Sequence, residues 1–84
     1  MTQEELKSLK VDKPVDARGM ACPGPLLEAK RAVANVKGGQ IMDVMSSDEG
    51  TKSDLNRWAQ KMGHEYLGEI EEDGYWSIFV RIKA

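Results

Sequence analysis

The stretch DARGMACPGPLLEAK, Asp16–Lys30, contains the end of a predicted strand, the only cysteine of the chain and the start of a predicted helix. Pro23 follows this cysteine, Cys22, and Pro25 comes two residues later. A residue before proline is pushed out of the helical region, and proline is favoured at the first helical position. The sequence therefore places Cys22 at the N-cap of a helix that begins at Pro23, with Pro25 in its first turn.

Apolar residues at spacings of three and four predict two helices. The first helix ends at Gly38-Gly39 and has one apolar face, made of Leu26, Ala29, Val33 and Val36. The second helix ends at Gly63 and has a similar face, made of Leu55, Trp58, Ala59 and Met62. Each of these faces needs an apolar surface to cover.

Four strands complete the prediction. Pro14 opens a short edge strand, QIMDVMSS (40–47) forms a second strand, and the segment 64–83 forms a hairpin that turns at Asp73-Gly74. In the last strand Trp76, Ile78, Val80 and Ile82 share one face. The order β-α-β-α-β-β indicates the α/β class, as an α+β two-layer sandwich with two helices on one face of a four-stranded mixed sheet. The other face of the sheet is expected to be open to solvent or to a partner.

Residues 1–13 form a polar N-terminal extension before a single domain that spans residues 14–84. Thr2 and Glu5 have the spacing of a capping box, which would begin a short helix. We favour the alternative, a mobile tail, because the segment is mostly polar and charged.

Composition and charge exclude several classes of protein. Twelve basic and fourteen acidic residues give a net charge of -2, which argues against a dedicated nucleic-acid binder. No apolar run is long enough to span a bilayer, and the chain does not begin like a signal peptide, so we expect a cytoplasmic protein without membrane contact. One cysteine cannot form an internal disulfide.

The predicted position of Cys22 favours a reactive thiolate. A helix N-terminus carries partial positive charge and unpaired N–H groups, and both lower the pKa of a thiol. The N–H of Gly24 or of Leu26 is expected to point at the sulfur. Further positive charge is expected from Arg18, Lys30 and Arg31. A lone cysteine is also commonly a small buried hydrophobe, which is the alternative for Cys22.

Most thiol chemistries need residues that the chain does not have. An oxidoreductase of the C-x-x-C type needs a second cysteine, and a cysteine hydrolase needs a histidine base. The only histidine, His64, begins a predicted strand, and one cysteine with one histidine is too sparse for a structural zinc site. A single-thiol task remains, in which Cys22 carries sulfur as a persulfide and needs no metal or other cofactor.

The segment GMACPGPLLEAKRAV, Gly19–Val33, resembles the Cys-Pro-x-Pro signature of the TusA/SirA-like sulfur carriers. GGQIMDVMSSDEGTKSDL and GHEYLGEIEEDGYWSIFVRIK are also similar to this family, so the resemblance covers residues 14–83. It implies the same two-layer sandwich, a persulfide on Cys22 and structural roles for Pro23 and Pro25. Gly24 occupies the x position, where other members often have a larger residue.

The resemblance also implies partners. The expected sulfur donor is a cysteine desulfurase or a rhodanese, and the expected acceptor is a DsrE-like or similar protein. The sulfur would serve tRNA thiolation, cofactor assembly or sulfur oxidation. We expect the carrier itself to be a monomer.

Two further residues are candidates for partner contacts. Asp48 matches an acidic residue that helps docking in the family, and it also fits the N-cap of the second helix, where Ser47 and Thr51 are rivals. Met20 would either form an apolar collar at the docking surface or cover the core beneath the first helix.

A second function stays open, a non-catalytic regulatory or interaction module that binds protein or RNA through the open sheet face. The exchange Cys22→Ser separates the two hypotheses, because it abolishes sulfur loading in a carrier and leaves an interaction module intact. A stand-alone enzyme would need an acid, a base and a pocket that the sequence does not indicate.

Overall fold

The computed structural model describes residues 2–21 and 23–83. The predicted order of two helices and four strands is confirmed, with an additional short helix before them and one 3₁₀ turn, Val33–Asn35, after the first predicted helix. The elements are α1 (Gln3–Lys7), β1 (Lys13–Asp16), α2 (Gly24–Ala32), β2 (Ile41–Ser46), α3 (Thr51–Met62), β3 (Glu65–Glu71) and β4 (Trp76–Arg81).

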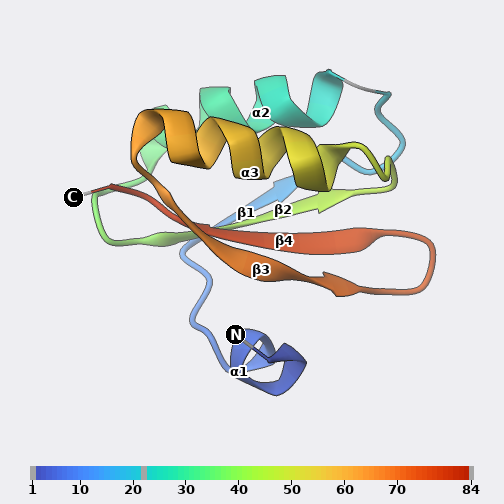
Figure 1. Cartoon of the computed structure of the whole chain (residues 1–84), viewed down its shortest axis with the longest axis horizontal. Helices are drawn as coiled ribbons and strands as arrows, with labels where there is room; N and C mark the ends of the chain where they lie inside the picture. Colours follow the sequence, from blue (N-terminus) through green and yellow to red (C-terminus); the bar gives the residue numbers. More distant parts are fainter. Residues whose placement is uncertain (1, 22, 84) are drawn as a thin grey trace.

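The four strands form one mixed sheet in the order β1-β2-β4-β3. Strands β1 and β2 are parallel, and the other neighbouring strands are antiparallel. Helices α2 and α3 lie side by side on one face of the sheet (Figure 1). This arrangement confirms the predicted α+β sandwich.

The topology gathers three connections at one edge of the sheet. The parallel strands β1 and β2 both end there, and Ser46 at the end of β2 pairs with Trp76 at the start of β4. The hairpin between β3 and β4 turns at the same edge, because Glu71 also pairs with Trp76. We call this region, made of the segments 17–21, 47–50 and 72–75, the carboxyl edge.

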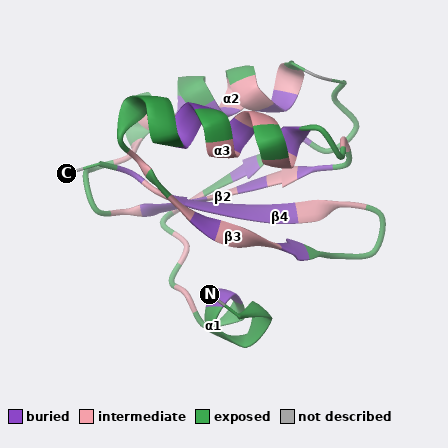
Figure 2. Cartoon of the chain, viewed as in Figure 1, coloured by how far each residue is buried: buried purple, intermediate pink, exposed green. Residues whose placement is uncertain are grey.

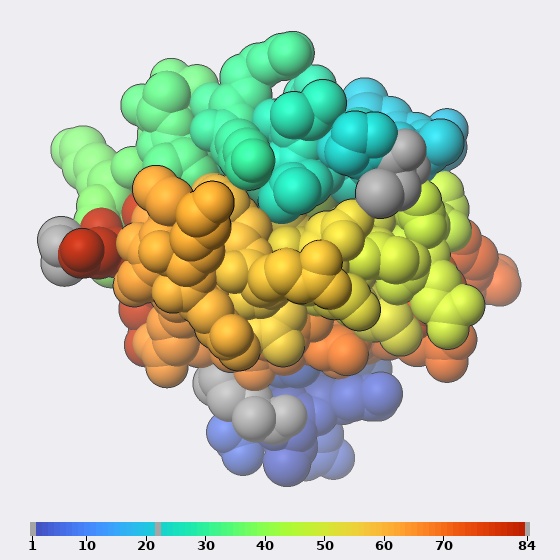
Figure 3. Space-filling model, turned by 45° about the horizontal axis from the view of Figure 1, so that its top comes forward, coloured from blue at the N-terminus to red at the C-terminus, as the bar shows by residue number. Residues whose placement is uncertain are grey.

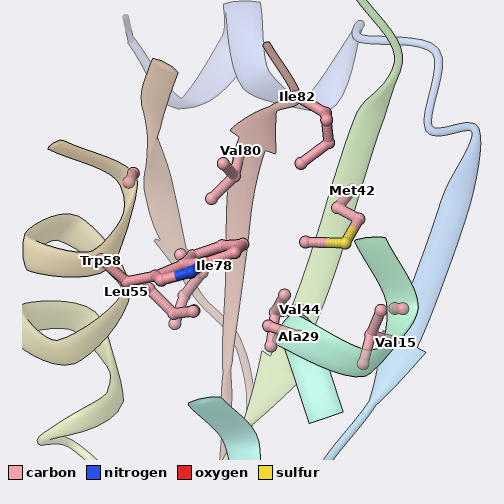
Figure 4. Close-up of a cluster of buried hydrophobic side chains, with 11 residues drawn as sticks. Val15, Ala29, Met42, Val44, Leu55, Trp58, Ile78, Val80 and Ile82 are labelled. Atoms are coloured by element: carbon pink, nitrogen blue, oxygen red, sulfur yellow. The ribbon is translucent and has the colours of Figure 1, made fainter. Parts of the chain in front are cut away.

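The main core lies between the two helices and the sheet (Figure 4). Leu55, Trp58 and Ala59 of α3 are buried as predicted, and Ile78 and Val80 of β4 meet them from the sheet. Leu26, Val33 and Val36 are only partly buried at the border of this core. The prediction for Met62 is wrong, since this side chain is 51% exposed at the end of α3. The helix ends there because Gly63 adopts a left-handed φ of 80°.

The opposite face of the sheet is partly covered, which corrects the expectation of an open face, and the first residues are not a mobile tail. Residues 3–7 form α1, and the N–H of Glu5 donates to the Thr2 hydroxyl at 3.2 Å. Figure 2 shows that most of α1 is exposed and that one segment of it is buried. Leu6 of this helix is 2% exposed. It packs in a second apolar cluster with Ile41, Leu67, Ile70 and Phe79, and Leu9 and Val11 lie against it. The few apolar residues of the extension fold back because the second face of the sheet is itself apolar.

A bulge in β3 makes room for this contact. The register of β3 against β4 shifts between Tyr66 and Gly68. Gly68 has a φ of +143°, which favours glycine. A Cβ at this position would lie 3.1 Å from Cδ1 of Leu6. The glycine therefore supplies both the backbone conformation of the bulge and the space for the leucine.

Asp43 is a half-buried carboxylate on the face that carries α1. It pairs with Phe79 across β2 and β4, and its Oδ1 has no hydrogen-bond partner among residues 2–21 and 23–83. Burial raises the pKa of Asp43, Glu72 raises it further, and a hydrogen bond with Ser77 partly offsets both.

We expect Asp43→Asn to stabilise the fold at neutral pH. The pKa of Asp43 is higher in the folded state than in the unfolded state. Protonation of Asp43 therefore stabilises the fold, and this contribution is fully present below the unfolded pKa of about 3.9. It is lost as the pH rises through the folded pKa. Urea unfolding at about pH 3.5 and about pH 7.5 measures this, and the variant should gain stability over the wild type only at the higher pH. Asp73→Asn, at an exposed turn, is the control. Equal differences at both pH values would contradict the prediction.

Candidate functional site

The segment that leads to the Cys-Pro-Gly-Pro motif lies at the carboxyl edge. Cys22 itself lies outside the described residues, but the prediction that it is the N-cap of the helix is wrong, because the N-cap of α2 is Pro23. Its neighbours Ala21 and Pro23 are both exposed. The site is therefore built from the residues on either side of the cysteine.

Helix α2 begins one residue later than predicted. Its N-cap is Pro23, with φ −97° and ψ 21°, and Gly24 is the first helical residue. The N–H of Leu27 donates to the carbonyl of Pro23 at 3.0 Å. The reason is a turn before the helix, in which the N–H of Gly24 donates to the carbonyl of Ala21 at 2.7 Å. The Gly24 N–H thus has a carbonyl acceptor. The predicted contacts of the Gly24 and Leu26 N–H groups with the sulfur fall on Cys22, which lies outside the described residues, and stay predictions.

Pro25 lies in the first turn as predicted and is buried. Gly24 allows Met20 to approach the helix closely, because a Cβ at Gly24 would lie only 3.1 Å from Cβ of Met20. Met20 is itself 39% exposed. It thus forms part of the surface beside the motif, as an apolar collar would, and does not sit beneath the helix.

Leu27 is a residue that the sequence interpretation missed. It is 51% exposed on the first turns of α2. The signal was present, since Leu27 is a second leucine that falls outside the predicted apolar face of the helix. With Met20, it places two exposed apolar side chains at sequence positions close to the motif, which is typical of surfaces that bind proteins.

Arg18 is held by two contacts. Its Nε and Nη2 donate to Oδ1 and Oδ2 of Asp16, both at 2.9 Å, and its guanidinium lies 4.9 Å from the centre of the Tyr75 ring. Hydrogen bonds from Arg18 lower the pKa of Asp16 to about 2. The charge of Arg18 is therefore paired, and the contact with Tyr75 links the segment before the motif to the hairpin.

The three predicted cations are not gathered in one place. Arg31 pairs with Glu28 at 3.1 Å, beside the edge strand β1. Lys30, the next residue along α2, lines a groove that α2 and α3 share. Arg18 lies over the hairpin. Neighbouring residues of a helix point about 100° apart, so Lys30 and Arg31 serve different surfaces.

Asp48 is not the N-cap of α3, and neither are Ser47 and Thr51. The N-cap is Gly50, without a side-chain cap bond. Oδ1 of Asp48 accepts a hydrogen bond from the N–H of Gly50 at 2.9 Å. The carboxylate therefore closes a turn that directly precedes α3. The hydroxyls of Ser46 and Thr51 lie 2.8 Å apart and are buried, which ties the end of β2 to the start of α3. A docking role for Asp48 stays a prediction.

Ser47 links two segments of the carboxyl edge. The N–H of Gly19 donates to Oγ of Ser47 at 2.8 Å, so the segment before the motif is attached to the connection between β2 and α3. We expect Ser47→Ala to weaken this attachment by about 1 kcal/mol, the typical net value of one hydrogen bond. Hydrogen exchange at the Gly19 amide measures it and should be about fivefold faster in the variant. Ser53→Ala, in an exposed part of α3, is the control, and equal exchange in both variants would refute the role of this bond.

His64 has a structural environment at the opposite edge of the sheet. Its Nδ1 accepts the N–H of Lys83 at 2.9 Å, and its ring centre lies 4.9 Å from that of Trp58. Burial, followed by the charge of Lys83, lowers its pKa. Among residues 2–21 and 23–83, no group of three potential metal ligands occurs. In the same part of the chain, no helix is long and apolar enough to cross a membrane.

Comparison with known proteins identifies the family. The family described as sulfurtransferase TusA matches residues 13–82, which include the whole Cys-Pro-Gly-Pro motif. The chain belongs to this family. A sulfur carrier protein TusA of Pseudomonas syringae is 30% identical over 81 residues, with 96% of each chain covered. A protein of Archaeoglobus fulgidus that is provisionally named a sulfur carrier is 43% identical over 67 residues, which cover 80% of this chain and 92% of the relative.

A solved structure has the same fold as this TusA-family chain. The SirA-like protein of Desulfitobacterium hafniense superposes with a TM-score of 0.68 at 25% identity. The match covers 86% of this chain and 99% of the other. The resemblance to TusA/SirA-like proteins inferred from the motif is thereby confirmed.

Proposed function

We propose that this chain is a sulfur carrier that accepts sulfane sulfur on Cys22 and passes it from a donor protein to an acceptor protein. One observation carries the proposal. The family match spans the Cys-Pro-Gly-Pro motif, and the cysteine of that motif is the only thiol in the chain. A chain with one thiol can carry sulfur only as an adduct of that thiol.

Both steps of the relay are exchanges between sulfur atoms. The Cys22 thiolate attacks the outer sulfur of a donor persulfide, a new S–S bond forms on Cys22, and the old S–S bond breaks to release the donor thiolate. An acceptor thiolate then attacks the outer sulfur on Cys22, and the Cys22 thiolate leaves. No net oxidation takes place, and the chain needs no base of its own because thiolates are already the nucleophiles.

The partners in the proposal are a cysteine desulfurase or a rhodanese as donor and a DsrE-like or similar protein as acceptor. The exposed Met20 and Leu27 support contact with such proteins, since methionine and leucine adapt to varied apolar surfaces. The rival function, an interaction module, relied on an open sheet face. Helix α1 covers part of that face, which weakens the argument for the rival.

Intact-mass spectrometry tests the proposal. The wild-type chain is incubated with a cysteine desulfurase plus cysteine, or with polysulfide. We expect a gain of one or more sulfur atoms that a reductant removes. If no donor produces an adduct, the carrier function fails and an interaction module becomes the better hypothesis.

A further inference from the structure

Two contacts join the chain on either side of its only cysteine. The N–H of Gly24 donates to the carbonyl of Ala21 at 2.7 Å. Met20 lies against Gly24, because a Cβ at this glycine would lie 3.1 Å from Cβ of Met20 and 3.6 Å from its sulfur. Met20 and Gly24 stand two residues before and two residues after Cys22. A hydrogen bond and a side-chain contact therefore close the loop to which Cys22 belongs.

The segment that carries Met20 is anchored to the sheet. The N–H of Ala17 donates to the carbonyl of Met45 in β2 at 2.9 Å, and the N–H of Met20 donates to the carbonyl of Ala17 at 3.2 Å. The N–H of Gly19 donates to Oγ of Ser47. Figure 3 shows this segment, in light blue, at the same end of the molecule as the start of α2. Met20 thus connects a segment held by the sheet with the first residue of the helix.

Gly24 is explained by the approach of Met20 and not by its own backbone. It is not among the glycines with a positive φ, so other residues can adopt its conformation. Alanine also favours a helix more than glycine does. However, a Cβ at 3.1 Å from Cβ of Met20 is closer than the separation of about 3.5–4.0 Å at which carbon atoms attract best. A side chain at Gly24 would therefore push Met20 away from the start of α2.

The position of the thiol relative to α2 affects its reactivity. The partial positive charge of a helix N-terminus favours a thiolate, and this effect fades within the first turn. We propose that Met20 is a positioning residue for Cys22, and that its packing against Gly24 keeps the thiol close to the start of α2. This inference rests on the proposed sulfur-carrier function and deepens it, because the thiolate is the species that attacks the donor persulfide.

Alkylation by iodoacetamide tests this role without a partner protein. The Cys22 thiolate displaces iodide from the reagent, and the chain has no other thiol. The midpoint of the rate against pH therefore reports the pKa of Cys22. We expect a higher midpoint in Gly24→Ala and in Met20→Ala, which corresponds to a thiolate fraction about threefold smaller at any pH well below the midpoint. Met20→Leu, which keeps a side chain of similar size, should retain the wild-type midpoint.

A second alanine substitution is the matched control. Gly50 precedes α3 with a φ of −66°, and the atom nearest to a Cβ there is Oδ1 of Asp48 at 3.4 Å. Gly50→Ala should leave the midpoint of Cys22 unchanged. None of these substitutions alters a charged residue, so the charges of the carboxyl edge are the same in all variants. Thermal unfolding checks that each variant is folded, and if Gly24→Ala is not, Met20→Ala decides alone, since Met20 is 39% exposed.

The double variant Gly24→Ala/Met20→Ala shows whether one contact is responsible. Its midpoint should rise no further than in either single variant, because both substitutions break the same contact. A rise equal to the sum of the two single effects, no rise in the single variants, or an equal rise in Gly50→Ala would overturn the proposal. Failure of polysulfide to load the wild type would overturn the carrier function instead, and alkylation would still decide the role of Met20.

Discussion

Replacing Cys22 with serine is expected to abolish sulfur loading completely. The chain has one cysteine, so no second thiol can accept the sulfur. A serine hydroxyl does not form a stable bond to sulfane sulfur under these conditions, and it is not ionised at neutral pH. Intact-mass spectrometry of wild type and Cys22→Ser, after the same incubation with polysulfide, measures the difference. The wild type alone should gain a mass that a reductant removes.

The comparison needs a control for folding. Thermal unfolding of Cys22→Ser should resemble that of the wild type, because the two side chains have nearly the same shape. Ser47→Ala, which keeps the thiol and changes the same edge of the sheet, should still be loaded. An adduct on Cys22→Ser would place the sulfur elsewhere, and it would refute a relay through Cys22.

Leu6→Ala is expected to be the most destabilising of the substitutions proposed outside the motif. Leu6 is 2% exposed in the cluster on the second face of the sheet. Removing most of a buried leucine side chain costs about 2 kcal/mol or more, from lost transfer free energy and from the cavity that remains. We expect a value near 2 kcal/mol, because a terminal helix can detach and this limits the loss. Urea unfolding at neutral pH measures the change.

Leu27→Ala is the matched control, because it makes the same chemical change at a side chain that is 51% exposed. It should alter the free energy of unfolding by no more than about 0.5 kcal/mol. Hydrogen exchange at residues 3–7 should also become faster in Leu6→Ala only. Equal effects of the two substitutions would mean that α1 does not contribute to stability.

Helix α1 has a consequence for the surfaces left to partners. The family model matches from residue 13, so α1 precedes the matched part of the chain. It covers Ile41, Leu67, Ile70 and Phe79, which would otherwise present an apolar surface. The helix layer and the carboxyl edge then remain as the surfaces on which we place partner contacts.

Local sequence signals were sufficient for most of the architecture. The alternation in β4 separates Ile78 and Val80, which lie in the main core as predicted, from Phe79 on the other face of the sheet. Asp73-Gly74 marks the hairpin, and Gly74 has the positive φ of 86° that such a turn favours. These features are local, because the period of a strand and the backbone freedom of glycine do not depend on distant residues. The motif likewise singles out the cysteine by its spacing to the two prolines alone.

Tertiary structure decided the features that depend on which residues pack against one another. Leu6 reads as one apolar residue in a polar segment, and only the bulge at Gly68 and the apolar face of the sheet show where it packs. Lys30 and Arg31 are adjacent in sequence but face different surfaces. The start of α2 at Gly24 depends on the hydrogen bond to Ala21. The sequence by itself thus determined the helices and strands and the position of the thiol. The packing of these elements against one another determined which side chains are buried, which charges are paired and where the groove between α2 and α3 lies, because these properties depend on residues far apart in the chain.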